Sequence, residues 1–404
     1  MSYLAEAVVV LVGFVNSIII TRALGVEGRG QYALAMTVVT VLALVLGDGL
    51  SRANTYLAGR DEENATRLFG NLSVYTFALF LLLALTGLVA LPLFRSVLPG
   101  LSDRLILLAI FVVPFLIGLR TINAIFLGMQ RYEIYNLFLA LPFILYLLAN
   151  IVILKFSDLI PEKVLLNYWL AIVIAYGLII YLFVNQGHAP WQTSAQLARE
   201  SWHAGSRAAV SHISLFLLFR VDIFLINLFL GVGAAGLYSI AVLLAELVQK
   251  LANTSGNVIF PKIAKDRGNK SRKLTVYVLL FVVIVGLVFS VFMYLFGQEL
   301  IVTLYKKEFA AAARPLFWLL PGTIFMAGAK ILNFALWAHG FPRVTVYAPV
   351  AALVTNIVLN ILLIPRFGIA GAAAATSTSF ILYSIVLSVY YFKRFGFHQP
   401  VDEK

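Results

Sequence analysis

Long runs of apolar residues, each about the length of a membrane span, follow one another along the whole chain. A helix rising 1.5 Å per residue needs about 20 mainly apolar residues to cross about 30 Å of hydrocarbon. About twelve such runs can be distinguished, and this pattern predicts an all-α protein with about twelve transmembrane helices. The predicted spans are 3–21, 31–58, 68–92, 105–127, 134–154 and 164–184, then 206–230, 234–261, 274–296, 315–338, 344–364 and 369–392.

The longest polar interruption lies midway along the chain and predicts the division into lobes. Residues 185–205 carry Trp191, Arg199 and Trp202, a mixture typical of an amphipathic helix at the lipid headgroups. The chain start has no basic region and no clear cleavage site, so its apolar run is interpreted as a span and not as a signal peptide. The predicted parts are a six-helix lobe 1–184, a cytosolic linker 185–205, a six-helix lobe 206–392 and a cytosolic tail 393–404.

Composition supports a membrane protein. Hydrophobic residues make up 62% and charged residues 12%, far from the balance of a soluble domain. The net charge is +12 and there is no cysteine. These values exclude an ordinary soluble enzyme, a disordered chain and a disulfide scaffold. Because no basic face accompanies a soluble core, nucleic acid is not an expected partner.

The basic residues predict how the chain is oriented. Lysine and arginine number 15 in the connections on the side of both termini and 10 on the other side, and six of the 15 fall in residues 262–273. Basic loops favour the cytoplasm. Both termini, including the tail that ends in Lys404, are therefore predicted to be cytoplasmic, with the basic segment 262–273 touching anionic lipid headgroups.

The two halves of the chain match each other. Six spans per half is an even number, so both halves enter the membrane in the same sense and form a parallel repeat. Such a repeat predicts a substrate site between two lobes near the midplane. The matches are 24–32 (LGVEGRGQY) with 230–238 (LGVGAAGLY), Pro114 with Pro321, Pro142 with Pro349, Arg120-x-x-Asn123 with Lys330-x-x-Asn333, and Gly128-x-x-Arg131-x-x-x-Tyr135 with Gly340-x-x-Arg343-x-x-x-Tyr347.

Nine charged residues fall inside the predicted spans, where charge is costly unless it faces protein or water. Asp48 and Arg52 are four residues apart, which puts them on one helix face. The same spacing relates Glu246 and Lys250. Local charge neutralisation remains an alternative to a functional role for both pairs. The cations are Arg52, Arg120, Arg220, Lys250 and Lys330, and the acids are Glu6, Asp48, Asp222 and Glu246.

Several ordered motifs resemble the polysaccharide (Wzx-type) flippases of the multidrug/oligosaccharidyl-lipid/polysaccharide exporter superfamily. They are residues 22–32 (RALGVEGRGQY), 47–52 (GDGLSR), Arg220-x-Asp222 followed by 236–239 (GLYS) and 259–262 (IFPK), and 360–373 (NILLIPRFGIAGAA). The resemblance covers nearly the whole chain. Twelve spans favour the O-antigen, capsule or exopolysaccharide branch over relatives with fourteen spans.

The resemblance implies a protein of the bacterial inner membrane that moves an undecaprenyl-diphosphate-linked oligosaccharide from the cytoplasmic to the periplasmic leaflet. It implies alternating access, with spans one, two, seven and eight lining the cavity. Expected partners are this polyprenyl-diphosphate-linked glycan, membrane lipids and a polymerase or other polysaccharide-assembly proteins.

A diphosphate needs positive groups to replace its water, and arginine can hold phosphate oxygens in a two-pronged fork. Arg52 and Arg220, helped by Lys250, are therefore the predicted substrate residues, and Arg120 and Lys330 are repeat-related candidates. The acids Glu6, Asp48, Asp222 and Glu246 are candidates for coupling to H⁺ or Na⁺, with a structural ion pair as the alternative for each. His212 is interpreted as a packing residue.

Two other functions are weighed. A membrane polymerase or ligase needs a sizeable extracytoplasmic loop with catalytic groups, whereas these loops are short and hold no metal cluster or nucleophile–base set. We therefore expect no enzyme activity, cofactor or metal. A cation-coupled drug exporter of the same fold would favour an acid-lined cavity, but the spans hold five cations and four acids. Because this difference in charge is small, the resemblance of the motifs is what favours a flippase over a drug exporter.

Overall fold

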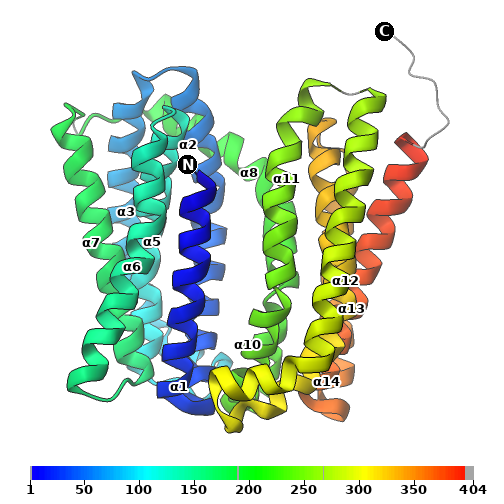
Figure 1. Cartoon of the computed structure of the whole chain (residues 1–404). Coiled ribbons are helices and arrows are strands. Elements are labelled where there is room, and N and C mark those ends of the chain that lie inside the picture. The colour runs from blue at the N-terminus through cyan, green and yellow to red at the C-terminus, as the bar shows by residue number, and fades with distance from the viewer. Residues whose placement is uncertain (1, 189–190, 267, 396–404) are drawn as a thin grey trace. The chain divides into compact units, whose positions relative to one another are not determined.

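The computed structural model describes residues 2–188, 191–266 and 268–395, and throughout these ranges the elements are helices without a strand (Figure 1). The first half contains α1 (Ser2–Ala43), η1 (Leu44–Asp48), α2 (Gly49–Arg60), α3 (Asn64–Val89), α4 (Leu91–Val97), α5 (Asp103–Gly128), α6 (Tyr132–Phe156) and α7 (Pro161–Asn185). The second contains α8 (Ala195–Leu218), α9 (Val221–Leu230), α10 (Val232–Ala245), α11 (Leu247–Lys265), α12 (Asn269–Tyr305), η2 (Lys307–Ala312), α13 (Ala313–Ala338) and α14 (Val344–Phe395).

The described helices supply twelve membrane crossings. Eight helical stretches are long and apolar enough to span, and two bent helix pairs bring the number to ten. Two of the eight, Ala5–Arg60 with 56 residues and Val344–Phe395 with 52, are far longer than one crossing requires. Each contains one glycine with a left-handed backbone, Gly25 at φ 66° and Gly368 at φ 61°, where the helix direction breaks. Dividing them there gives twelve spans and confirms the predicted all-α fold.

The structure differs from the sequence prediction at these two glycines. The predicted spans leave residues 22–30 and 365–368 outside the helices, as connections between spans. Instead, helix continues on both sides of a single non-helical residue. Glycine lacks a Cβ and so adopts positive φ without strain, which lets one residue redirect the chain where a loop was expected.

The four prolines that match between the two halves all lie inside helices. Pro114 lies inside α5, Pro142 inside α6, Pro321 inside α13 and Pro349 inside α14. Each removes one hydrogen bond from a membrane helix. The correspondence shows that α5 and α13 are equivalent helices of the repeat.

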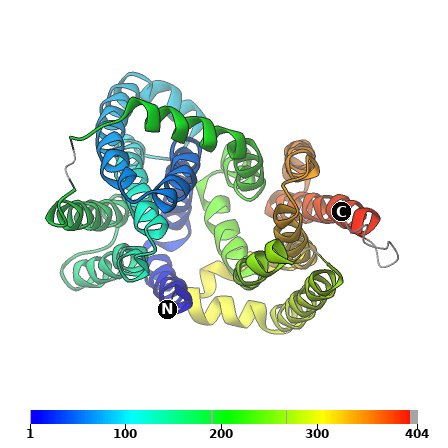
Figure 2. The same cartoon turned by 90° about the horizontal axis from the view of Figure 1, so that it is seen from above.

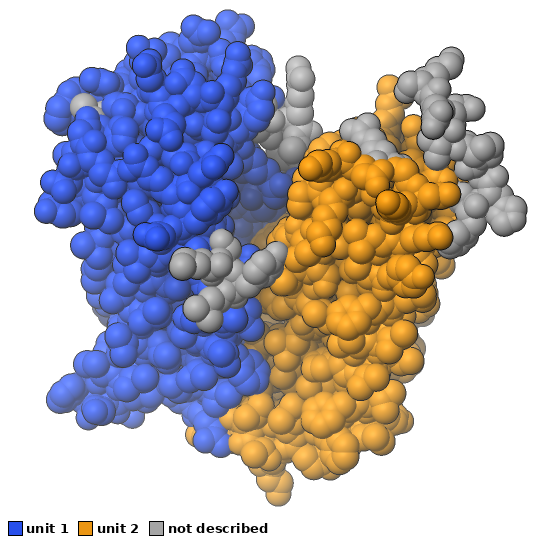
Figure 3. Space-filling view, turned by 45° about the horizontal axis from the view of Figure 1, so that its top comes forward, with its two compact units in different colours: residues 1–213 blue, residues 214–404 orange. Residues whose placement is uncertain are grey.

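The chain packs as two compact units, Met1–Ile213 and Ser214–Lys404, coloured separately in Figure 3. The most buried helix of the first unit is α5, which packs against α2, α3 and α7. In the second unit the most buried helix is α13, which packs against α11, α12 and α14. Each unit is therefore organised around the same helix of the repeat.

Outward-facing helix surfaces remain apolar, as expected in a lipid environment. On α12, Leu280, Ile284, Val288 and Val291 are all exposed. They recur every three or four residues, so they form one stripe along the helix. The stripe supports a lipid-facing position for α12.

Helix α8 begins within the predicted linker and continues toward the predicted seventh span. Viewed from above, its first part lies across the end of the first unit (Figure 2). The side chains of residues 204–210 are not described, and Arg267, Lys404 and most of the predicted tail, 396–404, lie outside the described residues.

Candidate functional site

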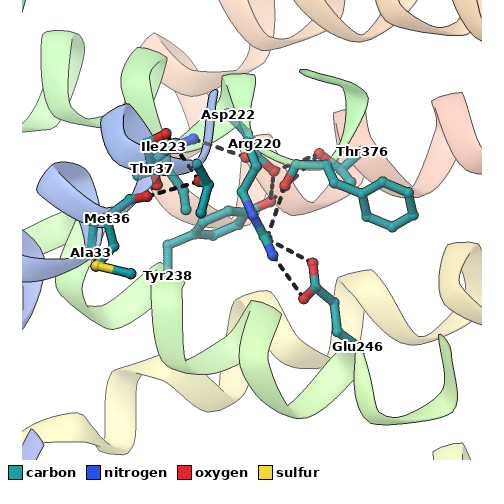
Figure 4. Close-up of polar contacts among 11 residues, drawn as sticks. Ala33, Met36, Thr37, Arg220, Asp222, Ile223, Tyr238, Glu246 and Thr376 are labelled. Atoms are coloured by element: carbon teal, nitrogen blue, oxygen red, sulfur yellow. Dashed lines mark hydrogen bonds and ion pairs between the residues drawn. The ribbon is translucent and has the colours of Figure 1, made fainter. Parts of the chain in front are cut away.

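An ion pair in the second unit joins two helix breaks. Arg220 lies between α8 and α9, where the chain bends by 42°, and Glu246 lies between α10 and α11, where it bends by 40°. Nη1 of Arg220 donates to Oε1 of Glu246 at 2.7 Å, and Nη2 donates to Oε2 at 3.0 Å (Figure 4). This two-pronged geometry is strong and directional. The ion pair therefore fixes both breaks relative to each other within this unit.

Asp222 is the centre of a second polar cluster. Its Oδ2 accepts hydrogen bonds from the hydroxyls of Tyr238 at 2.5 Å and Thr376 at 3.1 Å, and its Oδ1 accepts from the backbone N–H of Ile223 at 2.9 Å (Figure 4). Both Asp222 and Tyr238 are almost completely buried. Three converging donors stabilise a carboxylate away from water. Helices α9, α10 and α14 are thereby tied to one acid.

The cluster extends along α14 through two asparagines. Asn356 donates from its amide to the Thr376 hydroxyl at 3.1 Å, and Asn360 donates to Oδ1 of Asn356 at 2.9 Å. Both asparagines have no exposed surface. Among the described residues, Oδ1 of Asn360 is buried without a hydrogen-bond partner. An acid and several neutral oxygens, one of them unpaired, form the type of surroundings that a hard cation prefers.

The first unit contains a neutral counterpart of this cluster. With the offset of 206 that relates residues 24–32 to 230–238, Asn16 corresponds to Asp222, and Asn150 lies one residue from the position that the match of Pro142 with Pro349 gives for Asn356. Asn150 donates to Oδ1 of Asn16 at 3.0 Å, and Asn167 donates to Oδ1 of Asn150 at 2.8 Å, with all three side chains buried. The repeat therefore places a polar ladder in both units, but only the second ladder contains a carboxylate.

In the first unit the predicted pair of Asp48 and Arg52 forms. Nε of Arg52 donates to Oδ2 of Asp48 at 2.9 Å, and Nη2 donates to Nδ1 of His212 at 3.3 Å. The Arg52 side chain is still 51% exposed. His212 therefore contacts a charged group, the guanidinium of Arg52. Because half of Arg52 is accessible, it can receive a further anion without first leaving Asp48.

The predicted pairing of Glu246 with Lys250 is not the ion pair that the structure contains. The carboxylate of Glu246 binds Arg220, which is 26 residues away in sequence, and the Lys250 side chain is exposed. The backbone N–H of Lys250 still donates to the carbonyl of Glu246 at 3.3 Å, so the four-residue spacing holds, but the carboxylate of Glu246 is taken up by both prongs of Arg220.

Three predicted residues remain, and one of them, Lys330, lies close enough to Glu246 and Arg220 for electrostatic interaction. Lys330 lies with Nζ 5.0 Å from the centre of the Phe219 ring, a cation–π contact in the second unit. Arg120 is exposed on α5, and Glu6 is half-buried near the start of α1. None of the three is joined to Arg220, Asp222 or Arg52 by a hydrogen bond that the described residues show.

Four members of the Asp222 cluster were not predicted as site residues: Tyr238, Thr376, Asn356 and Asn360. One signal was available for Tyr238, which ends the repeated segment 230–238 and matches Tyr32. Asn356 and Asn360 are uncharged residues of predicted spans, where asparagine commonly joins helices by hydrogen bonds. Their convergence on Asp222 depends on packing between α9, α10 and α14, which residue spacing does not reveal.

Two repeated membrane units with charged groups at helix breaks define the class of protein: a membrane transporter fold of two helical lobes. Residues 1–266 match the sequence profile of the polysaccharide biosynthesis protein family, and the chain belongs to this family.

Two curated proteins are similar to this chain in sequence. The probable low-salt glycan biosynthesis flippase Agl15 of Haloferax volcanii is 26% identical over 207 residues, covering 49% of this chain and 43% of that protein. An uncharacterized membrane protein of Methanocaldococcus jannaschii is 24% identical over 256 residues, covering 61% and 50%. The chain thus matches about half the length of these curated relatives.

Among solved structures, the lipid II flippase MurJ in an inward closed conformation has a TM-score of 0.82 at 14% identity, covering 96% of this chain and 87% of that one. An inward-facing multidrug resistance transporter of the MATE family, in the MOP superfamily, has a TM-score of 0.76 at 16% identity, covering 96% and 94%. These likenesses show a shared fold.

Proposed function

We propose that this protein is a flippase that moves a polyprenyl-diphosphate-linked oligosaccharide from the cytoplasmic to the outer leaflet by alternating access. Membership of the polysaccharide biosynthesis protein family and the fold shared with a lipid II flippase support this function. The observation that carries it is the two-pronged hold of Arg220 on a carboxylate inside the membrane-spanning region. A phosphate offers the same pair of oxygens to a guanidinium.

Binding at Arg220 requires an exchange of partners. Glu246 occupies both prongs of the guanidinium, so a diphosphate must displace it. The two side chains are about a quarter exposed, which gives an anionic ligand access. Because Arg220 and Glu246 lie at two helix breaks, exchanging the partner also releases those breaks from each other. Substrate binding would in this way be coupled to bending of the spans.

Arg52 is the corresponding phosphate contact of the first unit, and its exposed half needs no exchange. Lys250 is an exposed cation that adds positive charge to the second unit. Arg120 and Lys330 remain secondary candidates, with Lys330 positioned by Phe219.

The experiment is flipping of a fluorescent undecaprenyl-diphosphate oligosaccharide by the purified protein in proteoliposomes. Arg220→Ala and Arg52→Ala should each lower the flipping rate by about tenfold or more, the effect of losing a charge-assisted hydrogen bond. The matched controls are Arg220→Lys and Arg52→Lys, which keep the charge without the fork and should retain intermediate rates. Wild-type rates in both alanine variants would contradict the proposal.

We propose Asp222 as the coupling residue among the four predicted acids. It alone lies in a buried ladder with neutral oxygens around it, including the unpaired Oδ1 of Asn360. Asp48 and Glu246 each already have an arginine partner, and Glu6 is outside the cluster. Binding of H⁺ or Na⁺ at Asp222 would neutralise its charge and change its bonds to Tyr238 and Thr376.

Asp222→Asn tests this role, because it keeps the side-chain shape and reproduces the residue of the first unit, Asn16. Flipping by this variant should no longer respond to an imposed Na⁺ or pH gradient, whereas flipping by Asn16→Ala should still respond. Gradient-dependent flipping that persists in Asp222→Asn would reject Asp222 as the coupling site.

The same fold is found in multidrug transporters of the MATE family, so drug export is the competing function. Fluorescent cationic dyes can be supplied to the same proteoliposomes in place of the lipid. Dye transport without lipid flipping would replace the flippase proposal. Absence of enzyme activity, cofactor and metal stays a prediction.

The finer parts of the proposal concern the cell and the partners. We place lobes 1–184 and 206–392 in the bacterial inner membrane, with the linker 185–205, the tail 393–404 and both termini on the cytoplasmic side. Undecaprenol is the proposed carrier, the O-antigen, capsule or exopolysaccharide pathway the proposed setting, and a polymerase the proposed partner. Co-purification of a polymerase with the tagged chain tests the last of these.

A further inference from the structure

A pocket of about 430 Å³ lies between the end of α2 and the beginning of α8, within the first unit. It is separate from the intramembrane clusters described above. Its lining combines three basic side chains with one acid and an aromatic ring. The lining residues are Tyr56, Leu57, Arg60, Gln196, Arg199, Glu200 and His203.

The charges of the pocket favour an anion. Arg60 and Arg199 are both exposed, and the described part of the chain provides no hydrogen bond or ion pair to either guanidinium. Glu200 is the one acid of the lining, and its Oε1 already accepts a hydrogen bond from Gln196 at 3.0 Å. The pocket therefore presents two unoccupied forks, the donor arrangement that binds phosphate oxygens.

Hydrogen bonds hold the two walls of the pocket together. Ser201 of α8 donates to Oδ1 of Asn54 in α2 at 2.8 Å, and both residues are buried. Asn71 of α3 binds the backbone of Ser194 in both directions, each at 2.9 Å. The start of α8 is thus fixed to α2 and α3, so the pocket exists before any ligand arrives and little ordering is needed on binding.

The surroundings place the pocket at the membrane surface. Trp191 and Trp202 flank the α8 wall in sequence and are 76% and 58% exposed. Exposed tryptophan is typical of the lipid headgroup level.

One face of α2 connects the pocket with the interior of the span. Arg52, Tyr56 and Arg60 are spaced by four residues each, so they lie one above another on the helix. Arg52 is 51% exposed and Tyr56 is 66% exposed. A phosphate leaving Arg60 therefore meets a second arginine about 12 Å further along the same face, at 1.5 Å per residue.

From these observations we infer that the pocket of Arg60 and Arg199 is a loading site for the phosphate group of a membrane lipid. The lipid is the polyprenyl diphosphate substrate, which the pocket binds at the membrane surface before Arg52 receives it. Its identity as the substrate rests on the proposed function, whereas the phosphate chemistry rests on the pocket alone. Other anionic lipids carry the same phosphate ester chemistry and are compared in the test.

The test measures lipid binding by the full chain in nanodiscs of phosphatidylcholine, with undecaprenyl diphosphate and phosphatidylglycerol titrated separately. The double variant Arg60→Gln/Arg199→Gln should bind undecaprenyl diphosphate about tenfold more weakly or worse, as expected for lost charge-assisted bonds. Arg67→Gln is the matched control, an exposed arginine of α3 outside the pocket, and should bind like the wild type. A thermal unfolding midpoint equal to that of the wild type verifies that the double variant is folded.

Each result decides the inference. Selective loss of undecaprenyl diphosphate binding supports the loading site. An equal loss of phosphatidylglycerol binding supports a phosphate pocket but overturns the substrate as its specific ligand. Unchanged binding of both lipids by the double variant overturns the inference altogether.

Flipping kinetics distinguish this inference from the function on which it rests. In proteoliposomes the double variant should raise KM for the lipid substrate while the maximal rate stays close to that of the wild type. Failure of lipid flipping by the wild type itself would reject the proposed function, and the binding titrations would still decide whether the pocket holds phosphate.

Discussion

In the second unit, Arg220 and Asp222 are close in sequence but have different partners. Arg220 makes two hydrogen bonds to Glu246, at 2.7 and 3.0 Å, so its positive charge is compensated before any ligand binds. Asp222, only two residues away, has separate partners in Tyr238 and Thr376. Arg220 and Asp222 therefore belong to two separate polar clusters, although they are close in sequence. This separation allows anion binding and cation coupling to be tested independently.

Glu246→Gln should free the guanidinium of Arg220 for a ligand. We expect binding of undecaprenyl diphosphate to strengthen several-fold, because the substrate no longer competes with a carboxylate. Stability should fall by about 1–3 kcal/mol, the range for a partly buried charge that loses its partner. Lipid titration and detergent thermal unfolding measure the two effects. The control is Glu299→Gln, at an exposed acid of α12, and equal affinities in both variants would argue against partner exchange.

His188 provides a pH-dependent contribution to stability outside the spans. Partial burial and the nearby Arg131 lower the pKa of His188 from its usual value of 6.5. Its Nδ1 lies 2.6 Å from the Thr66 hydroxyl, and its ring contacts Phe183. Because the folded pKa is below the unfolded one, this contribution is complete above pH 6.5 and is lost as pH falls through the lowered pKa.

The unfolding midpoint of the wild type should therefore fall more between about pH 7.5 and about pH 5.5 than that of His188→Phe, which keeps a ring but does not titrate. Thermal unfolding in one detergent at both pH values measures the difference. The same decrease in both proteins would assign the pH effect to other groups.

At the scale of elements, the close crossing of α2 and α5 depends on a missing side chain. A Cβ on Gly128 would lie 2.4 Å from the backbone oxygen of Thr55, and a Cβ on Gly59 would lie 3.2 Å from the oxygen of Gly128. Small residues at helix crossings allow backbones to approach in membranes. This crossing supports the helix that carries Arg52 and Arg60.

Gly128→Ala should separate α2 from α5 and destabilise the protein by about 1–3 kcal/mol, as overpacking does. Gly177→Ala in α7 is the control, since nothing lies within 4 Å of a Cβ there, and it should be neutral or slightly stabilising. Detergent thermal unfolding compares the two. Equal midpoints would show that the crossing can widen freely.

Elements also show the limits of prediction from sequence. The spacing of Asp48 and Arg52 was sufficient to predict their ion pair because both lie on one helix face. The same rule was wrong for Glu246, since its carboxylate binds Arg220, which lies at the break between α8 and α9, 26 residues away in sequence. Hydrophobic runs located the spans but left residues 22–30 and 365–368 between them, where helix continues on both sides of Gly25 and Gly368. The spacing of residues along one helix therefore predicts contacts within that helix, but not contacts with other helices.

At the scale of the whole molecule, orientation follows from charge and can be tested directly. The chain has no cysteine, so single cysteines can be introduced without a background. Asn269→Cys, within the basic segment 262–273, should be labelled by a membrane-impermeant thiol reagent only from the cytoplasmic side. Ser157→Cys should be labelled only from the opposite side. Both positions are exposed, and labelling of the pair from one side would overturn the assigned topology.

The sequence by itself determined that this is a helical membrane protein of about twelve spans in two repeated halves. The reason is that the length of an apolar run and the order of motifs can be read directly along the chain. It also located the charged residues that a membrane tolerates poorly. Only the tertiary structure decided their partners: Arg220 with Glu246, and Asp222 with Tyr238 and Thr376. It also brought Arg60 and Arg199 into one pocket. The reason is physical, since a side-chain contact between helices depends on how the helices pack and not on their separation along the chain.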